Sequence, residues 1–275
     1  MNVKILFLLY IILFSSILTA EVISPDSLSG LRLWLKSDEL TQANGTQINT
    51  WADSSGNNND AVAILAAPIK DEVTINVSGG TNTFSIAKFS SNTLDLLRAE
   101  NIFNNSLVTN GTIIAIYRVD TSSTGIGRPL GFGSYRYTSG NTNWNLGPDP
   151  SLRFDGSYIN TGYQQTHALN EFILRSSTKN GQNFTEWFDG NLALATVTHS
   201  SSLSIVDEFY LGDVRQDSGA ETLNQDIAEV LVFDRVLSNS ERQGVEAYLN
   251  QKFFVSNIPE LSSAQRRKFT LDNIR

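Results

Sequence analysis

A strand and a capped helix follow one another directly near the end of this chain, and they constrain its fold more than any other segment. In IAEVLVF at 227–233 nearly every residue is apolar, and Val, Ile and Phe favour a buried strand. Ser238 and Glu241 have the S-x-x-E spacing of a capping box, which satisfies backbone N–H groups at a helix start. Val245 and Leu249 then recur at helical spacing. The segment predicts a buried strand followed by a short helix, over 239–253, with one apolar face.

The first twenty residues have the features of a secretory signal peptide. One Lys is followed by ten apolar residues at 5–14, and the stretch ends on Thr19 and Ala20. This run is shorter than the roughly 20 apolar residues that a spanning helix needs, although an uncleaved anchor stays open as an alternative. We therefore expect residues 1–20 to direct export to a secreted or cell-envelope location, and the mature chain to have no membrane span.

Composition limits the partners of the mature chain. Without the first twenty residues it has 19 basic and 28 acidic residues, a net charge of −9. Such a surface repels phosphate backbones, which argues against nucleic-acid binding. The chain has no cysteine, so as an exported protein it must fold by its core alone. We predict one domain over 21–255 and a polar tail over 256–275, with a short helix from Ser262 as the alternative for the tail.

Short apolar stretches separated by Gly, Asn, Asp and Ser recur along this domain and predict strands. Asp189-Gly190 between two of them is a strong signal for a two-residue hairpin turn. Regularly spaced strands with a single terminal helix favour an all-β fold, an antiparallel two-sheet sandwich. The expected strands are 31–35, 73–77, 84–89, 111–119, 172–176, 184–188, 193–198, 209–211 and 227–233.

Both ends of the domain resemble laminin-G-like domains of the concanavalin-A-like lectin/glucanase superfamily. The resemblance is carried by LRLWLKSD at 31–38, INTWADSSGNNNDA at 48–61 and DIAEVLVFDRVLSNSER at 226–242, and it covers about residues 28–254. It implies a jelly-roll sandwich that is often extracellular, often carbohydrate-binding and sometimes calcium-dependent. Many relatives have no known activity, so the resemblance alone does not decide function.

The glucan-cutting enzymes of that superfamily resemble one another in an E-x-D-x-x-E strand, which this chain lacks. The nearest pattern places Glu229 three residues after Asp226 and five before Asp234. In a regular strand, odd separations put Glu229 on the face opposite both aspartates, where we expect it to have a structural role. There is also no G-x-S-x-G elbow, no cysteine nucleophile and no paired histidine motif. We therefore expect no enzymatic activity.

A polar loop is the candidate calcium site. Oxygen-bearing side chains at 53, 55, 57 and 59 imitate the early positions of a calcium loop, with Asp53, Asn57 and Asp60 as the expected ligands. The alternative is that Asp53 and the asparagines hold a tight turn through hydrogen bonds to the backbone. An acidic loop over 213–226 is a weaker second candidate for a metal.

A second loop has the composition of a sugar site. Pyranose rings stack on aromatic faces and bond to amides and acids, and such residues gather within 135–145. The alternative is that the aromatic residues only cover a sandwich edge. The expected ligand-binding residues are Tyr135, Tyr137, Asn141, Asn143, Trp144 and Asn145.

These patterns lead to a secreted, non-catalytic domain that binds carbohydrate or another extracellular ligand such as a protein, possible calcium being the only expected cofactor. One alternative is a structural or adhesive envelope protein that makes protein contacts only. A weaker alternative is a polysaccharide hydrolase or lyase whose site has no recognised motif.

Overall fold

Two antiparallel sheets and one α-helix make up the parts of the chain that the computed structural model describes. These are residues 21–120, 129–133, 144–146, 151–154, 157–160, 170–198, 205–212 and 224–255. The predicted signal peptide and polar tail lie outside them. The expected mostly-β architecture of two sheets with a C-terminal helix is present. Short 3-10 turns, η1 (Pro25–Ser27) and η2 (Ser37–Glu39), flank the first strand.

The first sheet, here called sheet A, has eight strands. Its order runs β14 (Asn191–Thr198), β13 (Asn183–Phe188), β12 (Ile173–Asn180), β7 (Asn110–Val119), β16 (Gln225–Phe233), β5 (Gly80–Phe89) and β4 (Ile69–Val77). The remaining strand, β1 (Leu31–Lys36), pairs with the later part of β16.

The second sheet, sheet B, also has eight strands, most of them short. Its order runs β11 (Ser157–Asn160), β10 (Ser151–Phe154), β9 (Trp144–Leu146), β8 (Leu130–Phe132), β15 (Glu208–Gly212), β6 (Leu96–Glu100), β3 (Ala61–Ala63) and β2 (Thr50–Trp51). The sequence predicted only β15 of these, because strands of two to five residues carry little periodicity.

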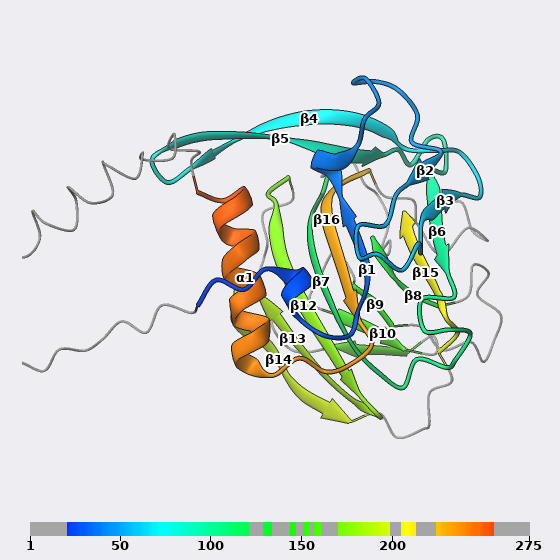
Figure 1. The fold of residues 1–275 in the computed structure, drawn as a ribbon, viewed down its shortest axis with the longest axis vertical. Coiled ribbons are helices and arrows are strands. Elements are labelled where there is room, and N and C mark those ends of the chain that lie inside the picture. The colour runs from blue at the N-terminus through cyan, green and yellow to red at the C-terminus, as the bar shows by residue number, and fades with distance from the viewer. Residues whose placement is uncertain are drawn as a thin grey trace, which may run out of the picture.

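The inner faces of the two sheets contribute to one apolar core (Figure 1). Sheet A supplies alternate residues such as Ile113 and Ala115 of β7, and sheet B supplies Phe209 and Leu211 of β15. Alternation along each strand points one set of side chains inward and the next set outward. The large buried area replaces the disulfides that this chain cannot form.

A charged pair is also buried in this core. The Arg175 guanidinium lies 2.6 Å from the Glu186 carboxylate, and both side chains are fully buried. Arg175 also donates to the Tyr117 hydroxyl at 3.2 Å and lies over the Phe188 ring. Burial disfavours the guanidinium charge, but Glu186 outweighs it and the pKa of Arg175 is raised. Removal of either partner alone would leave an isolated buried charge.

The predicted strand at 227–233 is the centre of sheet A. β16 pairs with β7 along almost its whole length, with β5 over its first three residues and with β1 over its later part. All nine residues of β16 are buried. A strand with neighbours on both edges and packed layers on both faces has to be apolar throughout, which is why this segment has the most distinctive sequence of the chain.

A bulge in β16 corrects the expected orientation of Glu229. The pairing with β7 shifts between Ile227 and Glu229, so one extra residue is inserted there. Asp226 is paired with Arg118 and Glu229 with Ile116, and both positions face the outer side of sheet A. The parity argument was wrong for Asp226 because it assumed a regular strand.

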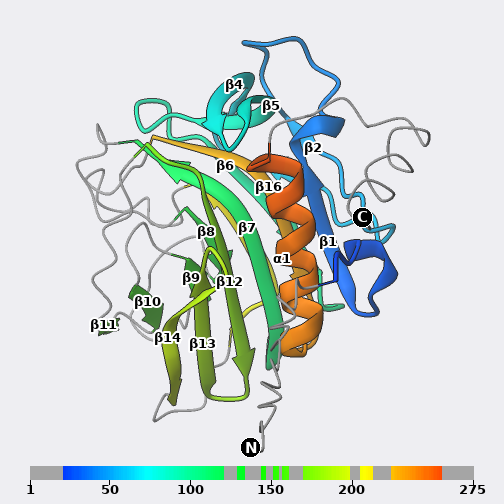
Figure 2. The same ribbon diagram turned by 90° about the vertical axis from the view of Figure 1, so that its left-hand side faces the viewer.

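The predicted helix is confirmed as α1 (Asn239–Phe253), with the Ser238–Glu241 capping box formed as expected. It lies against the outer face of sheet A (Figure 2), where Val245, Leu249 and Phe253 join a second apolar cluster. The buried Glu229 carboxylate accepts from Lys252 of α1 and from the Trp34 indole, both at 2.6 Å. Within the described chain no helix combines the length and apolarity needed to span a membrane.

Two hairpins frame this arrangement. The predicted Asp189-Gly190 turn joins β13 to β14, and both residues have positive φ, as a type I′ turn requires. At the other end of sheet A the β4–β5 hairpin projects over the C-terminal end of α1 (Figure 1). There Asn82 donates to the Lys252 and Phe253 carbonyls, which closes the helix end.

The capping box gives a direct stability prediction. Ser238→Ala removes the side-chain oxygen that accepts from the Glu241 N–H, so we expect the free energy of unfolding to fall by about 1 kcal/mol. Urea unfolding followed by circular dichroism measures the change. Asn239→Ala, at the next exposed position, is the control and should change stability by less than about 0.5 kcal/mol. Equal effects of the two variants would contradict the capping role.

Glu241 predicts a pH dependence. Hydrogen bonds from Arg235, and then from the Ser238 backbone, lower the pKa of Glu241 from 4.5 to about 2. A carboxyl with a lower pKa in the folded state contributes stability above the unfolded pKa, and this is lost as the pH falls through the folded pKa. We expect Glu241→Gln to be less stable than the parent protein at neutral pH, and the difference to shrink between about pH 4.5 and 2. Urea titrations across this range test it, and a constant difference would count against it.

Candidate functional site

A pocket opens at the end of sheet A where three central strands meet. β5 ends at Phe89, β7 ends at Val119 and β16 begins at Gln225, and Gln225 pairs with both of the other residues. Because β16 is antiparallel to both neighbours, its first residues and their last residues share one edge. The pocket at this edge has a volume of about 620 Å³, which falls within the size range of small-ligand sites.

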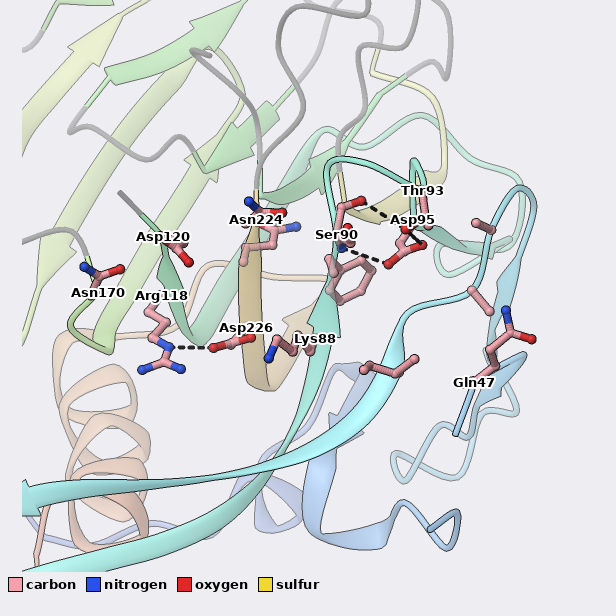
Figure 3. Close-up of a pocket in the computed structure, with 15 residues that line it drawn as sticks. Gln47, Lys88, Ser90, Thr93, Asp95, Arg118, Asp120, Asn170, Asn224 and Asp226 are labelled. Atoms are coloured by element: carbon pink, nitrogen blue, oxygen red, sulfur yellow. Dashed lines mark hydrogen bonds and ion pairs between the residues drawn. The ribbon is translucent and has the colours of Figure 1, made fainter. Parts of the chain in front are cut away.

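The lining is mainly polar (Figure 3). The aromatic residue among the described lining groups is Phe89, which is 2 % exposed, so its ring offers little face for stacking. Recognition in this pocket therefore depends on hydrogen bonds and charges. The polar lining residues are Gln47, Lys88, Ser90, Thr93, Asp95, Arg118, Asp120, Asn170, Asn224, Gln225 and Asp226.

A row of charged residues crosses the strands at one side of the pocket. Asp226 of β16 is in register with Lys88 of β5 and with Arg118 of β7. Its carboxylate accepts from Arg118 Nε at 2.5 Å, and the guanidinium lies over the Phe172 ring at 4.9 Å (Figure 3). Burial raises the pKa of Asp226, although Arg118 opposes the rise. The ion pair thus fixes the guanidinium at the pocket and leaves Lys88, which is half-exposed, to contact a ligand.

Opposite this row, short hydrogen bonds hold the loop between β5 and β6. The Asp95 carboxylate accepts from the Ser90 N–H at 2.8 Å and from the Thr93 hydroxyl at 2.7 Å (Figure 3). The Asn224 side chain accepts from the Ser91 N–H at 2.9 Å, which ties this loop to the start of β16. These bonds arrange the polar groups before a ligand arrives, and such order reduces the entropy lost on binding.

Gln225 is the most unusual lining residue. Its side chain is 2 % exposed, and its amide nitrogen donates to the Pro129 carbonyl at 3.1 Å. Its buried side-chain oxygen accepts from no group of the described chain. An unpaired buried oxygen costs about 1–3 kcal/mol, so native proteins keep few of them. An acceptor of this kind in a pocket suits a ligand that brings a hydroxyl or amine donor.

The expected sugar-binding loop does not form the pocket. Tyr135, Tyr137, Asn141 and Asn143 lie outside the described residues. Trp144 and Asn145 belong to β9 instead of a loop.

Trp144 has a core position, which corrects its expected place in a sugar site. Its ring is fully buried, stacked on Phe132 at 5.9 Å and in edge contact with Phe184. Its indole N–H donates to the Ser177 hydroxyl at 2.9 Å. No ring face is open to a pyranose, so the alternative interpretation of an aromatic residue that covers the sandwich core fits Trp144.

The expected calcium ligands hold a turn. The two Asp53 oxygens accept from the Trp34, Ser55 and Asn59 N–H groups and from the Ser55 hydroxyl, at 2.7–3.0 Å. Asp60 accepts from the Asp53 N–H at 2.8 Å. These donors occupy lone pairs that a cation would need.

Asn57 likewise uses its amide as a donor, toward the Leu31 carbonyl. Across the described chain, no three His, Cys, Asp or Glu side chains are placed to share a metal. The residues thus fit the turn interpretation better than a calcium site. The weaker acidic loop, with Asp217 and Glu221, lies largely outside the described residues.

The pocket residues were missed because they stand at the ends of strands that are far apart in the sequence. A usable signal was present: Arg118 with Asp120, and Gln225 with Asp226, are polar residues directly at the ends of strongly apolar strands. Which strand ends share an edge depends on the strand order, and the sequence did not provide that order.

Comparison with known proteins places the fold but not a family. No protein-family model matches the chain, and no curated protein sequence matches it. Among solved structures, Trypanosoma rangeli sialidase in complex with sialic acid is similar at a TM-score of 0.50 and 18 % identity, over 84 % of this chain and 34 % of that chain. The same sialidase with the inhibitor DANA gives 0.50 and 17 %, over 86 % and 36 %. The botulinum neurotoxin serotype D binding domain gives 0.47 and 11 %, over 79 % and 51 %.

This chain spans about one third of the length of the sialidase chains that it matches. At such low identity the likeness concerns the fold alone, a domain built from antiparallel sheets.

The ion pair at the pocket predicts a stability effect. Arg118→Met leaves the largely buried Asp226 carboxylate without its hydrogen-bond donor, so we expect a loss of about 2 kcal/mol in the free energy of unfolding. Adding Asp226→Asn should restore part of that loss, because the unpaired charge is removed. Urea unfolding of both single variants and the double variant forms the required cycle. A loss below about 0.5 kcal/mol in Arg118→Met would mean that the pair behaves as an exposed surface salt bridge.

Proposed function

We propose that this chain is an exported, non-catalytic binding domain of jelly-roll, laminin-G-like type, and that it recognises carbohydrate in the pocket at the end of sheet A. The observation that carries the proposal is the buried Gln225 oxygen, an acceptor without a donor in a pocket lined by polar side chains. Sugar hydroxyls supply donors to such an acceptor and accept from neighbouring cations at the same time.

The arrangement of the lining supports a saccharide over an apolar ligand. Lys88 and Arg118 offer donors on one side, and Asp95 and Gln225 offer acceptors on the other. A ligand bearing hydroxyl groups can satisfy both sides without a net charge. The sialidase of similar fold was solved with sialic acid, and this gives a first sugar to test with the present chain.

The engagement of the nearby acids supports a non-catalytic role. A retaining or inverting glycosidase needs two carboxyl groups that flank the scissile bond. Asp226 is held by Arg118, Asp95 by its own loop, and Glu229 by Lys252 and Trp34 on the helix side of the sheet. Each of these carboxylates has a structural partner that accounts for its position.

A glycan array tests the proposal, with Lys88→Met as the informative variant. Lys88 is half-exposed, so its replacement should leave stability within about 0.5 kcal/mol and weaken binding about ten-fold through the lost donor. The matched control is Asp71→Asn, which breaks the same ion pair from outside the pocket and should bind normally.

Gln225→Met should also lose binding. Equal binding by all variants would reject the pocket, and no binding to any glycan would favour a structural or adhesive protein. Release of product from an arrayed polysaccharide would favour the hydrolase or lyase.

Calcium enters as a separate arm of this experiment. The array is repeated with EDTA, and bound calcium is measured on the purified protein. If the loop at 53–60 holds calcium in spite of its internal hydrogen bonds, Asp53→Ala will lower the bound calcium. An unchanged calcium content after that substitution would remove Asp53, Asn57 and Asp60 as ligands.

A further inference from the structure

Asn145 on the outer face of sheet B is a second unusual buried amide. Trp144 and Leu146, its neighbours in β9, both point into the core between the sheets. Because side chains alternate along a strand, Asn145 points to the opposite, outer face. It is nevertheless only 1 % exposed, and neither its amide nitrogen nor its amide oxygen has a hydrogen-bond partner. Two unpaired polar atoms in one buried side chain are costly.

The neighbouring strand is built to receive this amide. Gly131 of β8 is in register with Asn145, and a Cβ at Gly131 would lie 2.5 Å from the Asn145 side-chain oxygen. Gly131 also has φ +151°, a conformation that other residues rarely adopt. The glycine therefore lets the amide lie across β8, on the side that leads toward β15.

On β15 the same register continues with polar residues. Tyr210 pairs with Gly131, and Arg98 of β6 pairs with Tyr210. The Tyr210 hydroxyl donates to Glu208 at 2.5 Å, and Arg98 lies 2.6 Å from Glu100. The row Asn145–Gly131–Tyr210–Arg98 thus has hydrogen-bonding groups on both sides of a position without a side chain.

We propose that the outer face of sheet B around Asn145 is a second saccharide-binding site, separate from the pocket at the end of sheet A. The amide offers one donor and one acceptor side by side, which matches the hydroxyl groups of a sugar ring. The assignment of the ligand class rests on the proposed function, whereas the position of the site rests on Asn145 and Gly131. Because the amide is covered, a sugar reaches it only after the covering groups move, and its association is slow.

Thermal unfolding without sugar tests whether the amide is kept for a ligand. Asn145→Leu removes two unpaired polar atoms with little change in volume, so the variant should unfold at the same temperature as the parent protein or higher. The matched control is Asn82→Leu, a buried asparagine whose amide donates to two carbonyls at the end of α1, and this variant should unfold at a lower temperature. A clear loss of stability in Asn145→Leu would overturn the proposal, because the amide would then have a structural partner.

Binding is measured on the full chain with sialic acid, N-acetylglucosamine and galactose as probes. The side-chain amide signal of Asn145 in nitrogen-15 spectra should shift saturably with at least one probe, and Asn145→Leu should weaken that binding about ten-fold or more. The shift should persist in Gln225→Met, which separates this site from the pocket. No shift at Asn145 while the pocket still binds would overturn this site alone. Loss of all sugar binding would reject the proposed function together with it.

Discussion

The burial of β16 on both edges and both faces is the constraint on which the rest of the structure depends. Each face of the strand supports a different apolar cluster, one between the sheets and one beneath α1. The bulge after Ile227 brings Glu229 to the helix side, where its buried carboxylate must have partners. Lys252 and Trp34 supply them, so the position of the helix is coupled to an irregularity in the central strand.

The same strand also positions the pocket. Gln225 and Asp226 are its first two residues, and each is held in register by β5 and β7. A site built on paired strands is more rigid than one built on loops, which suits recognition through hydrogen bonds of defined direction. Rigidity also explains how the Gln225 oxygen can remain unpaired: the strand fixes it, and its amide nitrogen is already committed to Pro129.

Local signals in the sequence gave correct predictions, and signals that depended on a partner did not. The capping box, the Asp189-Gly190 turn and the apolar strand each involve groups a few residues apart, so their residues alone specify them. Glu229 was assigned to the wrong face relative to Asp226, because a bulge exists only in relation to the paired strand. Trp144 was expected to be an open aromatic residue, because nothing in its own segment shows that Phe132 and Phe184 cover it.

By itself, then, the sequence determined an antiparallel two-sheet architecture, its buried central strand and its capped terminal helix. These follow from periodicity, turn chemistry and hydrogen bonds that act over a few residues. Only the tertiary structure decided which polar residues share a site. The pocket joins groups from Gln47 to Asp226, and the Asn145 row joins strands from β6 to β9. Such residues meet because strand order and register bring them to one edge or one face, and that order is set by packing across the whole domain.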